Sequence, residues 1–287
     1  MMRPEIPTYN MMVVANASYA KFCELFLRSF LDNADLNFVE KVFVIDVGLT
    51  RKQVQFFCSF PSVEVLKTSV STSFNNGGKW GTGWQDTVAQ KTRALRRVLH
   101  QTNEPLIMID ADCIVVKDFA ELIDSRYDIQ IAHRPSHSVP YLASFVVAHQ
   151  TPATLQFIEH WIKEIDTRPI GKPREGPAFC SVADQLGDQV RIGCIDRRLV
   201  STFSESEFSK ETYIIHLKGK SKEACRNLRD RERKSLDVEF LPIIDRYIGY
   251  KISRKWNKII LYFEQPIKKV AGRLLRLARR SIWKLGR

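Results

Sequence analysis

A chain of 287 residues, 44% of them hydrophobic and 26% charged, is long enough for one large globular domain with a substantial core. It has no run of 18 apolar residues and no signal-peptide pattern in residues 1–12, so we expect neither a membrane-spanning helix nor export. The net charge of +12 lies almost entirely in residues 245–287, where 13 Lys and Arg face two acidic residues, and the rest of the chain is nearly neutral.

The six cysteines are scattered along the chain, with no C-x-x-C pair among them. This spacing excludes a zinc site of the usual kind and favours a reducing compartment. A nucleophilic cysteine stays open, although none has an evident local partner.

Short apolar runs alternate with helical patterns in the first part of the chain. We predict strands over 11–16, 42–46, 63–66 and 105–109, and helices over 18–31, 50–57 and 86–100. Strands that alternate with helices predict an α/β fold in which most strands run parallel.

A glycine-rich segment, 75–84, lies before the third of these helices. It holds Trp80 and Trp84 and lacks P-loop spacing, so it is either a mobile loop with one Trp in the core or a lid over a ligand. Downstream we predict strands over 129–132, 144–148 and 213–216, a helix over 151–165 and a loop over 168–176.

Residues 241–287 differ in character from the rest, so we divide the chain into a folded domain, 1–240, and a basic helical extension, 241–287. Apolar residues recur at helical spacing on one side of the extension, and the basic residues opposite include Arg273, Arg276, Arg280 and Lys284. This amphipathic pattern favours docking of 245–287 on an anionic membrane surface. The alternatives are a helix packed on the folded domain and a nucleic-acid patch.

Asp110 and Asp112 directly follow the apolar strand 105–109. In an extended backbone, residues two apart point the same way, so both carboxylates can face one divalent cation at the strand's carboxyl end. A lone D-x-D is common by chance and can be a solvated turn. The apolar residues on both sides favour a buried strand that ends in a metal site, because open α/β sheets bind ligands at this edge.

The segment from His216 to Lys222 has a composition that complements the acidic pair. A histidine is a metal ligand, Gly219 lets the backbone approach a phosphate, and a lysine neutralises it. Taken alone, His216 reads as a structural histidine and Lys222 as part of a solvated face. With Asp110 and Asp112, they predict a clamp for a metal-bound pyrophosphate.

The D-x-D and the H-x-x-G-x-x-K of residues 216–222 together resemble the signature of family-eight glycosyltransferases. These are retaining enzymes with the GT-A fold, a Rossmann-like α/β fold, and they use nucleotide-sugar donors. The resemblance covers about residues 11–222. It implies a mixed, mostly parallel sheet flanked by helices, followed here by C-terminal amphipathic helices.

The resemblance also implies roles for individual residues. Asp110, Asp112 and His216 would hold Mn²⁺ or Mg²⁺, and Gly219 and Lys222 would hold the diphosphate. The residues implied to meet the rest of the donor are Ala15, Asn16 and Tyr19 at the base and ribose, and Lys91, Arg93 and Ala111 nearer the D-x-D.

Asp184 and Gln185 resemble the family's D-Q pair beside the transferred sugar, which implies a catalytic role with the glutamine near the anomeric carbon. For Asp184, a structural role as an N-cap or a surface acid is an equal alternative to the catalytic role. Two departures stand out: Glu223 and Ala224 follow Lys222 where the family has Pro-Trp, and 142–144 replaces its Asn-Ala-Gly turn.

We therefore expect a metal-dependent glycosyltransferase that moves a hexose from a nucleotide-diphosphate sugar, with a UDP-sugar implied, to a glycan or a lipid-linked acceptor. The resemblance implies retention. The basic extension predicts a cytoplasmic protein bound peripherally to the inner face of a membrane.

Two alternatives come from other classes. Residues 110–114 nearly match the D-x-D-x-T/V nucleophile motif of haloacid-dehalogenase-type phosphatases, although Ile114 and the preceding α/β structure depart from it. The other is a non-enzymatic protein that binds membranes or nucleic acid, and the nearly neutral body argues against nucleic acid.

Overall fold

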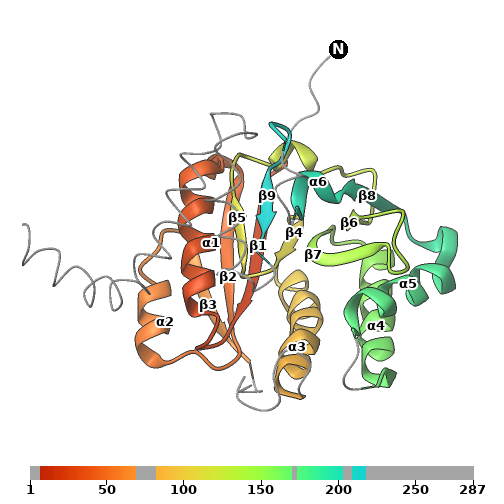
Figure 1. The fold of residues 1–287 in the computed structure, drawn as a ribbon, viewed down its shortest axis with the longest axis horizontal. Coiled ribbons are helices and arrows are strands. Elements are labelled where there is room, and N and C mark those ends of the chain that lie inside the picture. Colours follow the sequence, from red (N-terminus) through yellow and green to blue (C-terminus); the bar gives the residue numbers. More distant parts are fainter. Residues whose placement is uncertain (1–6, 69–81, 170–172, 203–208, 218–287) are drawn as a thin grey trace, which may run out of the picture. The chain divides into compact units, whose positions relative to one another are not determined.

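The structure is a computed structural model, and it describes residues 7–68, 82–169, 173–202 and 209–217 (Figure 1). Seven strands form the main sheet in the order β3-β2-β1-β4-β7-β6-β8. In that order they are Val63–Lys67, Val39–Asp46, Tyr9–Ala15, Leu106–Ile109, Tyr141–Ala148, Ile129–His133 and Ile192–Asp196. A separate two-stranded sheet pairs β5 (Cys113–Val115) with β9 (Ile214–His216).

Helices cover both faces of the main sheet. They are α1 (Ala20–Asn33), α2 (Arg51–Phe57), α3 (Thr82–Leu99), α4 (Pro152–Thr167), α5 (Glu175–Leu186) and the short α6 (Arg197–Val200). Three 3₁₀ turns complete the described elements: η1 (Leu36–Phe38), η3 (Ala120–Leu122) and η4 (Gly187–Gln189).

The core has two parts because successive strand residues point to opposite faces. In β1, Met11 and Val13 join the cluster formed with α1, α2 and β5, whereas Met12 and Val14 join the cluster formed with α3, α4 and α5. All seven residues of β1 are buried, as the unbroken apolar run of the predicted strand requires.

Strand direction decides which ends meet at one edge of the sheet. β1, β2, β3 and β4 run parallel, β7 runs antiparallel to β4 and β6, and β6 and β8 run parallel to each other. The carboxyl ends of β1, β4, β6 and β8 therefore lie at one edge, together with the start of β7 (Figure 1). The predicted mixed, mostly parallel sheet is confirmed.

Several predicted boundaries were wrong. The loop predicted over 168–176 ends at Arg174, because α5 begins at Glu175 and contains Gly176 and Pro177 in its first turn. A proline is tolerated there, since the first amides of a helix need no intrahelical acceptor. Gly176 is needed because a Cβ would lie 2.9 Å from Val139 Cγ1 and 3.0 Å from the Tyr141 carbonyl oxygen.

Other elements were missed or misplaced. β7 begins at Tyr141, so 142–144 belongs to a strand rather than a turn, and α3 begins at Thr82 rather than Asp86. β8 and α6 had no predicted counterpart. In β8, Gly193 interrupts the apolar pattern because a Cβ there would lie 2.7 Å from the Tyr127 ring.

The basic extension, and residues 75–81 of the glycine-rich segment, lie outside the described residues. Within the described ranges, none of the helices combines the length and apolar character needed to cross a bilayer.

Candidate metal centre

Asp110 and Asp112 lie in a tight turn that links the two sheets. The Cys113 amide donates to the Asp110 carbonyl oxygen at 3.2 Å, and the chain then enters β5. The extended geometry predicted for this pair was therefore wrong, because the backbone must leave the main sheet within two residues. The turn, rather than strand alternation, sets the two carboxylates.

His216 meets both carboxylates from the other end of the domain sequence. It ends β9, which pairs antiparallel with β5 so that His216 lies opposite Cys113. Its Nε2 is 3.2 Å from Asp112 Oδ1 and 3.5 Å from Asp110 Oδ2. The Leu217 amide also donates to the Asp112 carbonyl oxygen at 2.8 Å, which holds the end of β9 against the turn.

This donor set fits a hard divalent cation. Each of Asp110, Asp112 and His216 offers a ligand atom, and these atoms lie within 4.8 Å of one another. Two carboxylates with one imidazole suit Mn²⁺ or Mg²⁺, which accept further oxygen ligands from phosphates. The predicted convergence of the three residues on one point is present.

Lys91, from α3, holds Asp110 from the buried side. Its Nζ lies 2.6 Å from Asp110 Oδ1 and 3.2 Å from Glu175 Oε2, and it donates to the Ala143 carbonyl oxygen at 2.9 Å. Burial by itself lowers the pKa of Lys91, but the charges of Asp110 and Glu175 outweigh that effect and raise it. The ammonium group therefore stays charged with all three protons directed to acceptors.

Glu175, which the sequence reasoning missed, is the first residue of α5 and completes this buried network. Burial raises the pKa of Glu175 to about 7, helped by the charge of Asp110 and opposed by Lys91. Its Oε1 is buried without a hydrogen-bond partner among the described residues. The only sequence feature that could have pointed to Glu175 was an acidic residue beside Gly176 and Pro177, where the pattern indicated a loop.

The residues predicted to meet the base and ribose lie at the end of β1, the strand next to β4. Ala15 is buried, and Asn16 Oδ1 accepts from the Ser18 and Tyr19 amides at 3.0 and 3.1 Å. Asn16 Nδ2 is buried with no hydrogen-bond partner in the described part of the chain. Burial, then the charges of Asp112 and Asp110, raise the pKa of Tyr19.

Ala111 lies in the turn between the two aspartates and is buried. Its amide and small side chain belong to the same short stretch of backbone as the cation ligands. The structure therefore places four of the residues predicted to contact the donor at one edge of the sheet: Ala15, Asn16, Tyr19 and Ala111. Their contacts with a donor stay predictions.

Arg93, the second basic residue predicted to contact the donor, lies elsewhere. Its Nη2 donates to both carboxylate oxygens of Asp166 on α4, at 2.6 and 2.7 Å. Residues two apart on a helix lie about 200° apart around its axis. With Lys91 directed to Asp110, Arg93 therefore points away from the cluster.

The predicted catalytic pair is also placed away from the cluster. Asp184 and Gln185 are exposed near the carboxyl end of α5. Nine residues separate Asp184 from Glu175, which corresponds to about 13 Å along the helix axis. Gly219 and Lys222 lie outside the described residues, so the predicted diphosphate clamp stays a prediction.

Comparison with known proteins gives two findings on sequence. A family described as nucleotide-diphospho-sugar transferases matches residues 52–227, which include the D-x-D and His216. No curated protein sequence matches the chain.

Three solved structures with a similar fold are glycosyltransferases. The chain is 10% identical, with a TM-score of 0.50, to each of three. These are the galactosyltransferase LgtC, with donor and acceptor sugar analogs (82% of this chain and 99% of that one), the bifunctional WbbM (76% and 47%) and GlyE from Streptococcus pneumoniae TIGR4 (73% and 54%). The chain thus spans about half the length of WbbM and GlyE. At this identity the likeness shows the fold alone, and it confirms the predicted GT-A fold.

Proposed function

Because the chain belongs to the nucleotide-diphospho-sugar transferase family and has the fold of a glycosyltransferase, we propose that it moves a hexose from a nucleotide-diphosphate sugar in a metal-dependent reaction. The observation that carries the metal dependence is the convergence of Asp110, Asp112 and His216 at the carboxyl edge of the sheet. Sites at this edge are where open α/β sheets bind their ligands.

In this mechanism Asp110, Asp112 and His216 would hold Mn²⁺ or Mg²⁺ against the donor's diphosphate. The bound ion supplies Lewis-acid stabilisation of the negative charge that develops on the leaving nucleotide. Lys91 holds Oδ1 of Asp110, which leaves Oδ2 on the side of His216 and fixes the carboxylate's orientation. A ligand oriented in this way loses little freedom when the donor arrives.

The finer features of the proposal come from the resemblance to family eight. They are a UDP-sugar donor, a glycan or lipid-linked acceptor, retention of the anomeric configuration, and a diphosphate held by Gly219 and Lys222. Asn16 supports the donor side, because its buried amide nitrogen is a donor that a base or ribose oxygen can use.

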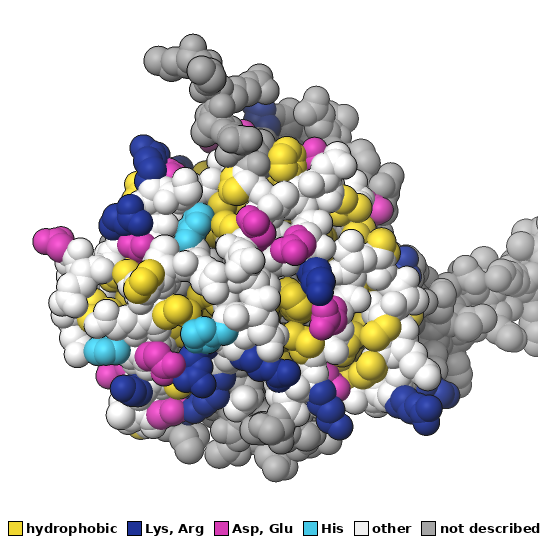
Figure 2. Space-filling model, turned by 180° about the vertical axis from the view of Figure 1, so that it is seen from behind, with side chains coloured by type: hydrophobic (Ala, Val, Ile, Leu, Met, Phe, Trp, Pro, Cys, Tyr) yellow, Lys and Arg dark blue, Asp and Glu magenta, His cyan; other side chains and the backbone are white. Residues whose placement is uncertain are grey.

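The two other classes have less support. Neither the family match nor the solved structures favour a phosphatase. Figure 2 shows one face of the protein on which basic and acidic side chains are interspersed, and phosphate-backbone binding needs a spread basic surface. Docking of 245–287 on an anionic membrane is part of the proposal and rests on its sequence pattern.

A panel of nucleotide sugars, scored for nucleotide release with and without Mn²⁺, tests the function. We expect release with at least one UDP-sugar, and a loss of about 100-fold or more in Asp112→Asn, since that variant removes a charge from the site. Asp188→Asn, an exposed acid on η4, is the matched control and should keep full activity. Release that is independent of metal, or equal in the two variants, would contradict the proposal.

Flotation with vesicles tests the extension. The full chain should float with vesicles that contain anionic lipid and stay behind with neutral ones, because Lys and Arg near an anionic surface each contribute about 1 kcal/mol. Replacing Arg273, Arg276 and Arg280 by Gln should weaken flotation. Equal flotation with both kinds of vesicle would count against an electrostatic anchor.

A further inference from the structure

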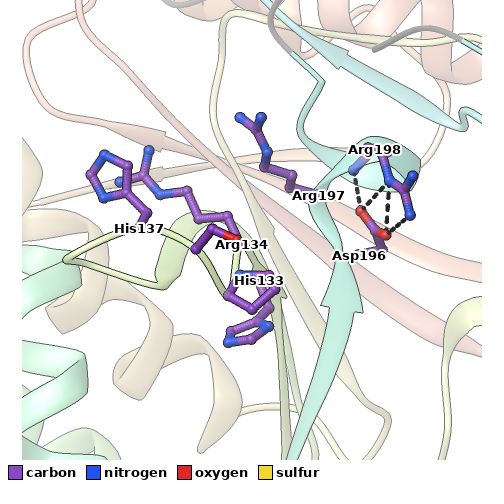
Figure 3. Close-up of a pocket in the computed structure, with 8 residues that line it drawn as sticks. His133, Arg134, His137, Asp196, Arg197 and Arg198 are labelled. Carbon is purple, nitrogen blue, oxygen red and sulfur yellow. Dashed lines mark hydrogen bonds and ion pairs between the residues drawn. The ribbon is translucent and has the colours of Figure 1, made fainter.

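A second site, lined by basic residues, lies at the same sheet edge as Asp110 and Asp112, beyond β7. It is an open pocket of about 330 Å³ between the β6–β7 hairpin and the end of β8 with α6 (Figure 3). Its lining residues are His133, Arg134, Pro135, Ser136 and His137 on one side, and Asp196, Arg197 and Arg198 on the other. A volume near 300 Å³ is sufficient for a small ligand.

The lining carries more positive than negative charge. Asp196 is the one acid among the lining residues, and Arg198 engages it through Nε and Nη2, as the dashed lines in Figure 3 show. Arg134 and Arg197 add two further cations, and burial together with the charge of Arg197 lowers the pKa of Arg134.

The geometry of Arg134 suits anion binding. Its Nε donates to the Val139 carbonyl oxygen at 3.0 Å, within the same hairpin, and this hydrogen bond fixes the plane of the guanidinium group. Carboxylates and phosphates are the planar or multi-oxygen partners that a fixed guanidinium binds best. His133, which packs on the Tyr141 ring at 5.3 Å, closes the adjacent side of the pocket.

The pocket is close to the cation site and shares its supports. β7 lies between β4 and β6, so two interstrand spacings, about 10 Å, separate the strand that leads to Asp110 from the strand that leads to the pocket. The carbonyl oxygen of Ser144 on β7 accepts a hydrogen bond from the Asp110 amide. The Ser144 hydroxyl is hydrogen-bonded to the hydroxyl of Ser201, the residue directly after α6. The amide of Ser201 in turn donates to the carbonyl oxygen of Arg197.

The residue after Ser201 extends this support to the third ligand. Thr202 bridges to Ile215 on β9, and its carbonyl oxygen accepts the His216 amide at 2.9 Å. One segment thus forms a wall of the pocket and fastens the strand that carries a cation ligand. The pocket wall is therefore held at a defined position relative to His216.

We propose that this pocket binds the anionic group of an acceptor sugar, a carboxylate or a phosphate, and so selects acidic over neutral acceptors. The inference rests on the glycosyltransferase function proposed above. A neutral sugar offers hydroxyl groups, which need hydrogen-bonding side chains but no excess of positive charge. The fixed guanidinium group of Arg134, with His133 and His137 beside it in the lining, instead matches an acidic group.

Binding to the full-length protein, measured by isothermal titration calorimetry, tests the inference with glucuronic acid, glucose 6-phosphate and glucose as probes. We expect at least one of the acidic sugars to bind at least 10-fold more tightly than glucose, and the stronger of the two identifies the group as carboxylate or phosphate. Arg134→Gln should weaken that binding by about 10-fold or more, since a charge-assisted hydrogen bond is lost. Arg51→Gln, an exposed arginine on α2, is the matched control.

Binding of UDP with Mn²⁺ in the same samples separates this inference from the proposed function. If UDP binds with Mn²⁺ but neither acidic sugar binds more tightly than glucose, the pocket inference is overturned and the function stands. It is also overturned if Arg51→Gln causes the same loss as Arg134→Gln, or if UDP displaces the acidic sugar, which would make the pocket part of the donor site. If UDP fails to bind while the acidic sugar does, the proposed function fails instead.

Circular dichroism of Arg134→Gln, together with a milder Arg134→Lys variant, separates lost binding from lost folding.

Discussion

Replacement of Lys91 by Met removes the cation from a buried group of three charges. The Lys91 side chain is 8% exposed, and it pairs with Asp110 at 2.6 Å and with Glu175 at 3.2 Å. Removing one partner of a buried ion pair typically costs about 3–5 kcal/mol, because the remaining charge is left uncompensated. We expect Lys91→Met to lower the free energy of unfolding by about 3 kcal/mol.

A second substitution separates charge from packing. Glu175→Gln keeps the shape of the side chain and leaves Lys91 paired with Asp110, so we expect a cost of about 1–2 kcal/mol. In the Glu175→Gln background, removal of Lys91 leaves one carboxylate without its partner rather than two. The double variant should therefore be more stable than the sum of the single effects by at least about 1 kcal/mol, within the range found for residues in one network.

Urea denaturation followed by tryptophan fluorescence measures these free energies. It should be done at pH 8, above the pKa of about 7 for Glu175, and with a chelator so that metal binding does not contribute. Arg93→Met is the matched control, since Arg93 lies on the same helix and its pair with Asp166 is 35% and 48% exposed. Such a pair contributes about 1 kcal/mol at most. Additive effects in the double variant, or a cost for Lys91→Met no larger than the control, would refute the network.

Three further outcomes are expected. Gly193→Ala should lower the free energy of unfolding by about 1–3 kcal/mol, measured in urea, because the new Cβ would lie 2.7 Å from the Tyr127 ring; an unchanged midpoint would contradict the packing. The Arg191 side chain donates to Asp128 and holds its pKa at about 2, below the unfolded value of about 3.9. The stability from Asp128 is thus complete above about pH 5 and lost as the pH falls toward 2, and Asp128→Asn should flatten that pH dependence, at a cost of about 1 kcal/mol near pH 7. Mn²⁺ at about 100 times its dissociation constant should raise the free energy of unfolding by about 2.7 kcal/mol, and Asp112→Asn should abolish the rise in thermal unfolding temperature.

The convergence of Asp110, Asp112 and His216 could be predicted from the sequence because their chemistry and their neighbours agree. Asp110 and Asp112 follow an apolar strand, and His216 ends another, so the sequence places all three at the ends of strands. The local geometry could not be predicted, because the turn at Asp110 depends on where β5 finds its partner. That partner, β9, lies about 100 residues further along the chain.

Glu175 could not be predicted for a different reason. Gly176 and Pro177 are typical of a loop, and only packing against Val139 and Tyr141 shows why a helix begins there. The helix before the D-x-D strand offers both Lys91 and Arg93, and the family resemblance implies a donor contact at the position of Arg93, whereas the structure directs Lys91 to Asp110 and Arg93 to Asp166. Helix periodicity separates the two, since only one of them can face Asp110.

The pairing of β5 with β9 also has a consequence for the order in which the protein folds. His216 reaches Asp112 only when a strand near residue 215 closes a loop of about 100 residues, and closing loops of this length is slow. Strands β1 to β4 pair with one another and with β7, all within residues 9–148, and can associate before β9 is available. The cluster of Asp110, Asp112 and His216 is therefore assembled at a late step, so that Mn²⁺ binding at the proposed site would report completed folding of the domain through residue 217.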